Sequence, residues 1–241
     1  MKALQLRGFF FNKRARCLNK SQGHGCSFMN IPRINRLSTA GRILHSRFYP
    51  AAHSGDFIAA LMLIDSLKLD YSRFDSFTGY VCPVQKPSGN QVPVALAYRI
   101  AAETNLELNN KVFLLNSKSG STMPERMLFK PEYSGEVYPG KYIIVDDVFT
   151  TGITLKYLKN YIESTGSTVN SIYTLGSSKF GLKFEPSRLN LRILKSHFPD
   201  IEHFFNLSDL TIAQVNYMLR FRSLDSFHYY VFKKNAEILL S

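Results

Sequence analysis

The sequence predicts an α/β fold built on a parallel β-sheet, with helical additions at its N- and C-terminal ends. Three observations lead to this prediction. First, 45% of the 241 residues are apolar and 20% are charged, which excludes a disordered, collagen-like or coiled-coil chain. Second, from residue 56 onward short β-prone runs alternate with segments of helical periodicity, as in βαβ units. Third, two polar, glycine-containing loops follow predicted strands, at the edge where such sheets bind ligands.

The elements expected between residues 57 and 175 alternate in type. The first is a helix over residues 57–67, with Phe57, Leu61 and Ile64 on one face. Pro93 suits the first turn of a later helix, because proline lacks the amide proton that a first turn leaves unpaired. The expected elements after the first helix are a strand over 78–84, a helix over 93–104, a strand over 111–115, a long loop over 117–140 with room for a hairpin, a strand over 142–146, a helix over 154–164 and a strand over 171–175.

A different pattern begins near Leu182. Residues 210–221 predict an amphipathic helix that is capped by Ser208 and carries Ile212, Val215 and Leu219 on one face. We therefore expect three parts: a basic, disordered N-terminal arm over 1–28, a core with an N-terminal flank over 29–181, and a mainly helical extension over 182–241.

The positive charge of the chain is concentrated near its N-terminus. The formal net charge is +12, but residues 1–55 hold ten basic and no acidic residues, whereas residues 56–241 hold 20 basic and 18 acidic ones. The body is therefore nearly neutral. The arm is compatible with contacts to phosphate backbones, with an organelle-targeting role, or with translation that starts at Met29.

The apolar runs and the cysteines indicate the cellular compartment of the protein. The longest apolar stretch covers only residues 57–64, so the sequence predicts no transmembrane helix and no membrane partner. The three cysteines, Cys17, Cys26 and Cys82, cannot form a disulfide framework and contain no C-x-x-C pair. We expect a reducing, cytoplasmic location.

The most informative segment runs from Tyr142 to Thr154 and reads YIIVDDVFTTGIT. An apolar strand leads into the adjacent carboxylates Asp146 and Asp147. A turn of small hydroxyl residues and Gly152 then opens a helix, so that free backbone amides form an anion site. Two carboxylates beside such a site suit a phosphorylated sugar, because carboxylates accept hydrogen bonds from vicinal hydroxyls and help to hold Mg²⁺.

This segment resembles the motif D/E-D-x-x-T-T-G-x-T with which type I phosphoribosyltransferases bind 5-phosphoribosyl-1-pyrophosphate (PRPP). The resemblance implies the Rossmann-like sheet of that family. It also implies that Asp146 and Asp147 act as catalytic residues, meeting the ribose hydroxyls and holding Mg²⁺ directly or through water. The remaining PRPP-binding residues that it implies are Val148, Phe149, Thr150, Thr151, Gly152 and Thr154, of which the threonines and the glycine bind the 5′-phosphate.

An upstream loop lies where the family keeps its pyrophosphate loop. The resemblance assigns this role to Gln85, Lys86, Ser88 and Gly89, with Lys86 neutralising pyrophosphate. The alternative for this loop is a plain turn with a solvated lysine.

The family also has a flexible loop that covers the reacting PRPP, and residues 117–140 occupy its place. Its basic candidates are Lys118, Arg126 and Lys130, and we expect Lys118 and Arg126 to be the catalytic ones. Lys179 and Phe180 follow the last expected strand and are candidates for binding the base, although a solvated lysine and a core phenylalanine are equally compatible with the sequence.

The implied activity is an Mg²⁺-dependent displacement of pyrophosphate from PRPP by a nitrogen nucleophile. The expected partners are PRPP and a nucleobase or amine, with a homodimer as an option. The alternative is a PRPP-binding regulator, or an effector from a defence or toxin operon, that acts through a protein or nucleic-acid partner of the arm or the C-terminal helix. A purely nucleic-acid-binding protein is disfavoured by the nearly neutral body.

Overall fold

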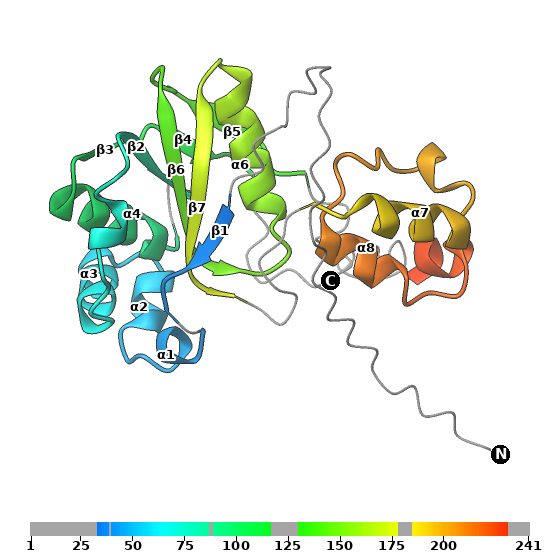
Figure 1. Ribbon diagram of the computed structural model, residues 1–241. Helices are drawn as coiled ribbons and strands as arrows, with labels where there is room; N and C mark the ends of the chain where they lie inside the picture. The colour runs from blue at the N-terminus through cyan, green and yellow to red at the C-terminus, as the bar shows by residue number, and fades with distance from the viewer. Residues whose placement is uncertain (1–32, 39, 87–88, 117–129, 178–184, 231–241) are drawn as a thin grey trace, which may run out of the picture. The chain divides into compact units, whose positions relative to one another are not determined.

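The computed structural model describes residues 33–38, 40–86, 89–116, 130–177 and 185–230, and Figure 1 shows how their elements are arranged. Several of the sequence predictions lie outside these residues. They concern the arm over 1–28 and the side chains of Ser88, Lys118, Arg126, Lys179 and Phe180.

A parallel sheet of five strands forms the centre of residues 33–177. Its strands follow the order β1-β7-β6-β2-β3, and every neighbouring pair is parallel. The strands are β1 (Arg33–Arg36), β2 (Gly79–Pro83), β3 (Leu106–Leu108), β6 (Lys141–Phe149) and β7 (Thr168–Ser177). This arrangement confirms the predicted α/β fold on a parallel sheet.

Helices cover both faces of this sheet (Figure 1). The helices are α1 (Ala40–Leu44), α2 (Tyr49–His53), α3 (Phe57–Ser66), α4 (Val92–Glu103) and α6 (Ile153–Ser164), with a short 3-10 helix η1 (Ser72–Phe74). The buried residues of α2, α3 and α4 share one apolar cluster, and those of α6 belong to a second cluster on the opposite face. Three layers result, with the sheet in the middle.

The central strand β6 shows how the sequence encodes these layers. Ile143 and Val145 belong to the cluster with α3 and α4, whereas Tyr142 and Ile144 belong to the cluster with α6. Successive side chains of a strand point to opposite faces, so a strand that is covered on both sides reads as one continuous apolar run. All four side chains are buried accordingly.

Two features of the sheet differ from the expectation. The strand expected over 111–115 is β4 (Val112–Leu114), but it pairs antiparallel with β5 (Tyr133–Gly135) in a separate two-stranded sheet. The place beside β2 is taken by the unexpected strand β3. Only three residues separate β3 from β4, which is far too few for the crossover that a parallel pair requires.

The C-terminal residues 185–230 form a helical module with a core of its own. It contains α7 (Arg188–His197), the 3-10 helix η2 (Ile201–His203), α8 (Ile212–Met218) and a further helical stretch over 224–230. Their apolar side chains form a third cluster that includes Leu194, Phe198, Val215, Met218 and Phe227. In the part of the chain that the structure describes, no helix combines the length and apolarity needed to cross a membrane.

The predicted cap of the helix over 210–221 is wrong. The helix is α8, and its N-cap is Thr211, whose hydroxyl oxygen accepts from the Gln214 amide at 3.3 Å while Gln214 Oε1 accepts from the Thr211 amide at 2.8 Å. Ser208 instead donates its hydroxyl to Asn206 Oδ1 at 2.9 Å in the preceding turn. The reciprocal capping box satisfies two amides at once, which explains why the helix begins at Ile212.

Candidate functional site

We use the word crevice for the edge of the sheet outside the carboxyl ends of its neighbouring central strands β2 and β6. From β2 the chain passes through α4 to β3 on one side, and from β6 it passes through α6 to β7 on the other side. The direction of winding therefore reverses between these two central strands. Open α/β sheets bind ligands at such a reversal, outside the carboxyl ends of the strands.

Asp146 and Asp147 lie at the carboxyl end of β6, where the strand leaves β2. The ladder with β2 ends at the pair Pro83 and Val145, whereas the ladder with β7 continues to Phe149 and Ser177. Backbone amides hold both carboxylates: Asp146 Oδ1 accepts from the Asp147 amide at 2.9 Å, and Asp147 Oδ1 accepts from the Val148 amide at 2.6 Å. Both side chains are therefore oriented before any ligand binds.

The turn after these carboxylates opens helix α6. Gly152 is the N-cap and has a φ of 75°, a left-handed conformation that glycine adopts without steric cost. Because glycine has no side chain, it cannot cap the first amides of α6. Thr151 is buried, with its Oγ1 at 3.5 Å from the Ile153 amide. The N-terminus of α6 therefore has the positive character that attracts a phosphate.

Two of the other residues in the motif have structural contacts. The ring of Phe149 is 1% exposed and packs in the apolar cluster with Leu155 and Leu158, so its backbone is the part available to a ligand. The carbonyl oxygen of Thr154 accepts from the Tyr133 hydroxyl at 3.0 Å, which joins α6 to β5. These contacts fix the turn from the side of the core.

The loop after β2 reaches the same carboxylates. Asn90 Nδ2 donates to Asp147 Oδ2 at 2.6 Å, and Asn90 Oδ1 accepts from the Val92 amide at 3.1 Å, in the first turn of α4. The single side chain of Asn90 therefore joins the two strand ends that border the crevice. The neighbouring Gln91 amide donates to the Ala52 carbonyl of α2 at 2.9 Å, which holds the same loop from the other side.

Lys86 lies in this loop and is close enough to both carboxylates to interact with them electrostatically. Partial burial lowers the pKa of its ammonium group, and the charges of Asp146 and Asp147 oppose that decrease. By contrast, the side chain of Gln85 turns away: its Nε2 donates to the carbonyls of Asn110 at 2.7 Å and Val112 at 3.0 Å. Only Oε1 of Gln85 is left for a further partner.

The pKa of the Asp146 carboxyl is also perturbed. Burial is the main cause that raises the pKa of its carboxyl well above the usual value, and the neighbouring charge of Asp147 raises it further. The amide of Asp147 and the ammonium group of Lys86 oppose this increase only in part. Asp146 in its ionised form therefore lacks enough compensating positive charge.

Two tyrosines also border the carboxylates. Burial, followed by the charges of Asp147 and Asp146, raises the pKa of Tyr49 in α2 to about 12. Burial and the charge of Asp146 raise the pKa of Tyr133 well above its usual value. Both hydroxyls therefore stay protonated near neutral pH, and that of Tyr49 is a candidate hydrogen-bond donor towards the crevice.

The structure thus unites the two sequence-predicted loops but adds three residues to them. Lys86 lies near the adjacent Asp146 and Asp147, and so do Asn90, Tyr49 and Tyr133, to which the sequence assigned no role. Asn90 is the last residue of the predicted loop over 85–90, so its position was a usable signal. The two tyrosines come from sequence regions without a motif, and only the fold brings them near.

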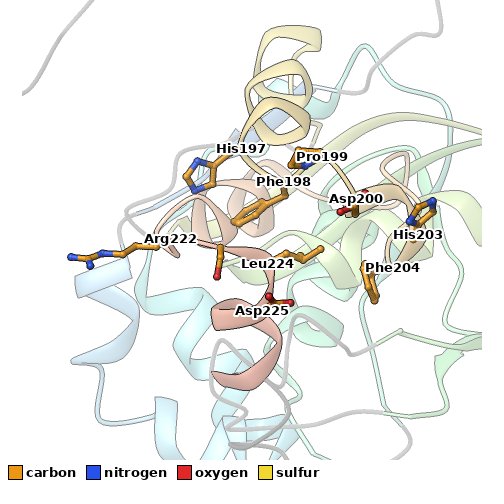
Figure 2. A pocket seen from close by; sticks show the side chains of 10 residues that line it. His197, Phe198, Pro199, Asp200, His203, Phe204, Arg222, Leu224 and Asp225 are labelled. Atoms are coloured by element: carbon orange, nitrogen blue, oxygen red, sulfur yellow. The ribbon is translucent and has the colours of Figure 1, made fainter.

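Residues of the C-terminal module line a separate cavity of about 480 Å³, which Figure 2 shows. Its apolar walls include Phe198, Phe204 and Leu224, and charged or polar groups surround them. None of its lining residues belongs to the two loops at the crevice. Across the described ranges, no group of three or more His, Cys, Asp or Glu side chains is arranged to hold a metal ion.

Comparisons with known proteins give one curated relative and several solved structures. No protein-family profile matches the chain. Protein TraN from Escherichia coli is 28% identical over 217 residues, which cover 82% of this chain and 48% of TraN. The chain therefore spans about half the length of that relative.

The similar solved structures are enzymes at low identity. Orotate phosphoribosyltransferase from Aeropyrum pernix is 18% identical, with 58% of this chain and 77% of that chain covered and a TM-score of 0.31. UMP synthase from Leishmania donovani is 16% identical, with 67% and 33% covered and a TM-score of 0.34. Adenine phosphoribosyltransferase from Thermoanaerobacter pseudethanolicus is 18% identical, with 51% and 80% covered and a TM-score of 0.29.

The raised pKa of Asp146 predicts how stability depends on pH. A carboxyl whose pKa is higher in the folded than in the unfolded state stabilises the fold at low pH, and this stabilisation is lost as pH rises through the raised value. We expect Asp146→Asn, which cannot ionise, to have a higher melting temperature than the wild type at about pH 8. The difference should shrink towards about pH 3, below the ordinary carboxyl pKa. Thermal unfolding followed by circular dichroism measures this, and a variant equally or less stable at about pH 8 would contradict the electrostatic description.

Proposed function

We propose that this chain binds PRPP together with Mg²⁺ and transfers its phosphoribosyl group to a nitrogen atom of a nucleobase or amine, with release of pyrophosphate. The observation that supports this best is the position of the motif D-D-x-x-T-T-G-x-T. It runs from the end of β6 into α6, on the border of the crevice between β2 and β6.

The groups around the crevice match the parts of PRPP. The turn at Thr151 and Gly152, with the start of α6 whose N-cap glycine has no side chain, suits the 5′-phosphate. Asp146 and Asp147 accept hydrogen bonds, as the ribose hydroxyls require. Lys86, on the opposite loop, supplies positive charge for pyrophosphate.

The site also fits Mg²⁺ as a cofactor. The adjacency of the two carboxylates, together with the burial that raises the pKa of Asp146, favours a bound cation. Mg²⁺ prefers oxygen ligands, keeps several waters, and is usually held by one or two carboxylates together with substrate phosphates. Asp146 and Asp147 would hold it, directly or through water, and the ion when bound would neutralise charge on pyrophosphate.

The proposed reaction breaks the bond between the anomeric carbon and the pyrophosphate oxygen and forms a bond from that carbon to the acceptor nitrogen. The acceptor loses one proton, and pyrophosphate leaves with the bonding electron pair. The anomeric carbon becomes electron-poor on the way, so the negative Asp146 and Asp147 stabilise it while Lys86 stabilises the leaving group. The backbone amides at Gly152 bind the 5′-phosphate and thereby position the ribose.

A second candidate is a PRPP-binding regulator that does not transfer the group. The C-terminal module favours it, because this module has a hydrophobic core of its own and the residues that line its cavity lie outside the two loops at the crevice. Both candidates require PRPP binding, and only the enzyme requires turnover.

Calorimetric titration with PRPP in the presence of Mg²⁺ tests the shared step. We expect binding by the wild type and a loss of at least about 100-fold in affinity for the double variant Asp146→Asn, Asp147→Asn, because hydrogen bonds to charged groups contribute most. Circular dichroism should show that the variant keeps its fold. A wild type without PRPP affinity would refute the proposal, whereas PRPP binding without pyrophosphate release from any nucleobase or amine would favour the regulator.

Single variants distinguish the two loops. Lys86→Ala should weaken binding of PRPP and pyrophosphate about tenfold and change ribose 5-phosphate binding little, because Lys86 is assigned to pyrophosphate. The near-isosteric Thr151→Val should weaken PRPP and ribose 5-phosphate alike, since both carry the 5′-phosphate. Titration with the three ligands measures this, and equal losses for all ligands in both variants would disprove the division between the loops.

A further inference from the structure

Helix α7 lies at the surface of its module and exposes two apolar side chains. Leu194 and the partly buried Leu191 turn into the third apolar cluster and hold the helix on its module. Leu189 is 62% exposed and Ile193 is 45% exposed. These two residues are four positions apart, so they lie next to each other on one face and form an apolar stripe.

A basic stripe runs beside the apolar one. Arg188 and Arg192 are also four positions apart and exposed, and α7 contains no acidic residue. Lys195 continues the stripe but is paired with Glu202 at 2.7 Å. Within the ranges that the structure describes, Arg188 and Arg192 form no ion pair. We call the surface formed by Arg188, Leu189, Arg192 and Ile193 the α7 face.

This charge pattern is unfavourable for the helix itself. Like charges four residues apart repel each other, and a cation in the first turn faces the positive end of the helix dipole. The capping box of Ser187 and Asn190 supports the helix start, with the Asn190 amide donating to Ser187 Oγ at 3.1 Å. A local choice that opposes the fold is typical of a functional surface.

The apolar stripe leads towards the cavity of the C-terminal module. His197 follows Ile193 by four positions and lines that cavity, and Figure 2 shows it at the end of α7, near Phe198. The exposed ring of Phe204 and the side chain of Leu224 belong to the same lining. A partner that lies along α7 would therefore reach a recess of mixed apolar and charged lining at the end of the helix, where an anchoring side chain can be buried.

We propose that the α7 face binds an amphipathic helix of a partner protein, one that carries acidic residues four positions apart beside an apolar stripe. The acidic residues of the partner helix would pair with Arg188 and Arg192. Its apolar residues would cover Leu189 and Ile193. A nucleic acid would satisfy the arginines but leave the apolar stripe in water. A membrane surface would gain too little buried apolar area from two side chains, and a second α7 would bring arginine against arginine.

A charge-swap experiment on the full chain tests this proposal. The probe is a fluorescently labelled, synthetic amphipathic helix with Glu four positions apart beside Leu, and binding is followed by fluorescence anisotropy. We expect Arg188→Glu with Arg192→Glu to weaken binding at least about tenfold, and a probe with Lys in place of Glu to restore it. The matched control, Arg36→Glu with Arg73→Glu, changes the net charge equally and should bind like the wild type.

A third variant examines the apolar stripe, and competitors identify the class of partner. Ile193→Ser should weaken the peptide complex without affecting the binding of PRPP, which separates this surface from the crevice. Absence of peptide binding, an equal loss in the matched control, or failure of the Lys probe to restore binding would overturn the proposal. Arginine-dependent binding of duplex DNA or of phosphatidylserine vesicles that is insensitive to Ile193→Ser, without peptide binding, would overturn it in favour of those ligands.

Discussion

Two adjacent carboxylates at the end of a buried strand are the constraint to which the rest of the crevice responds. Asp146 and Asp147 repel each other, and burial makes the ionised form of Asp146 costly. Backbone amides, Asn90 and Lys86 all contribute positive or donor groups to this pair. These groups do not fully compensate the negative charge of the Asp146 carboxylate. Binding of a cation and of hydroxyl donors would therefore stabilise the site. Such a cost to the free protein is typical of functional sites.

The topology of the sheet determines why these groups meet. Reversal of winding between β2 and β6 separates α4 and α6 at this end of the sheet, so that the loops before both helices face one crevice. The alternation of side chains along β6 directs Asp147 towards α2 and Asn90, and Asp146 towards Tyr133. The C-terminal module adds a different kind of surface, because its exposed α7 face is suited to a helix of another protein and its core is independent of the crevice.

The sequence alone predicted the elements whose signal is local. The apolar run before Asp146 and the glycine turn at Gly152 identify β6, α6 and the loop between them, because burial on both faces and a left-handed turn each restrict residue choice. Strands β1 and β3 were missed, since β1 has the polar sequence RINR and β3 has only three residues. Tyr49 and Tyr133 could not be predicted as neighbours of the carboxylates, because long-range packing alone brings them there.

We propose that PRPP and Mg²⁺ bind at the carboxylate pair, and the titration of Asp146 tests this proposal most directly. Carbon-detected NMR of the Asp146 carboxyl group measures its pKa in the full chain, first alone and then with Mg²⁺ and PRPP. The structure predicts a pKa well above the usual carboxyl value in the free protein. We expect this pKa to fall markedly when both ligands are present, because a cation beside the carboxylate favours the ionised form. An Asp146 pKa that is unchanged at saturating Mg²⁺ and PRPP would contradict binding at this pair.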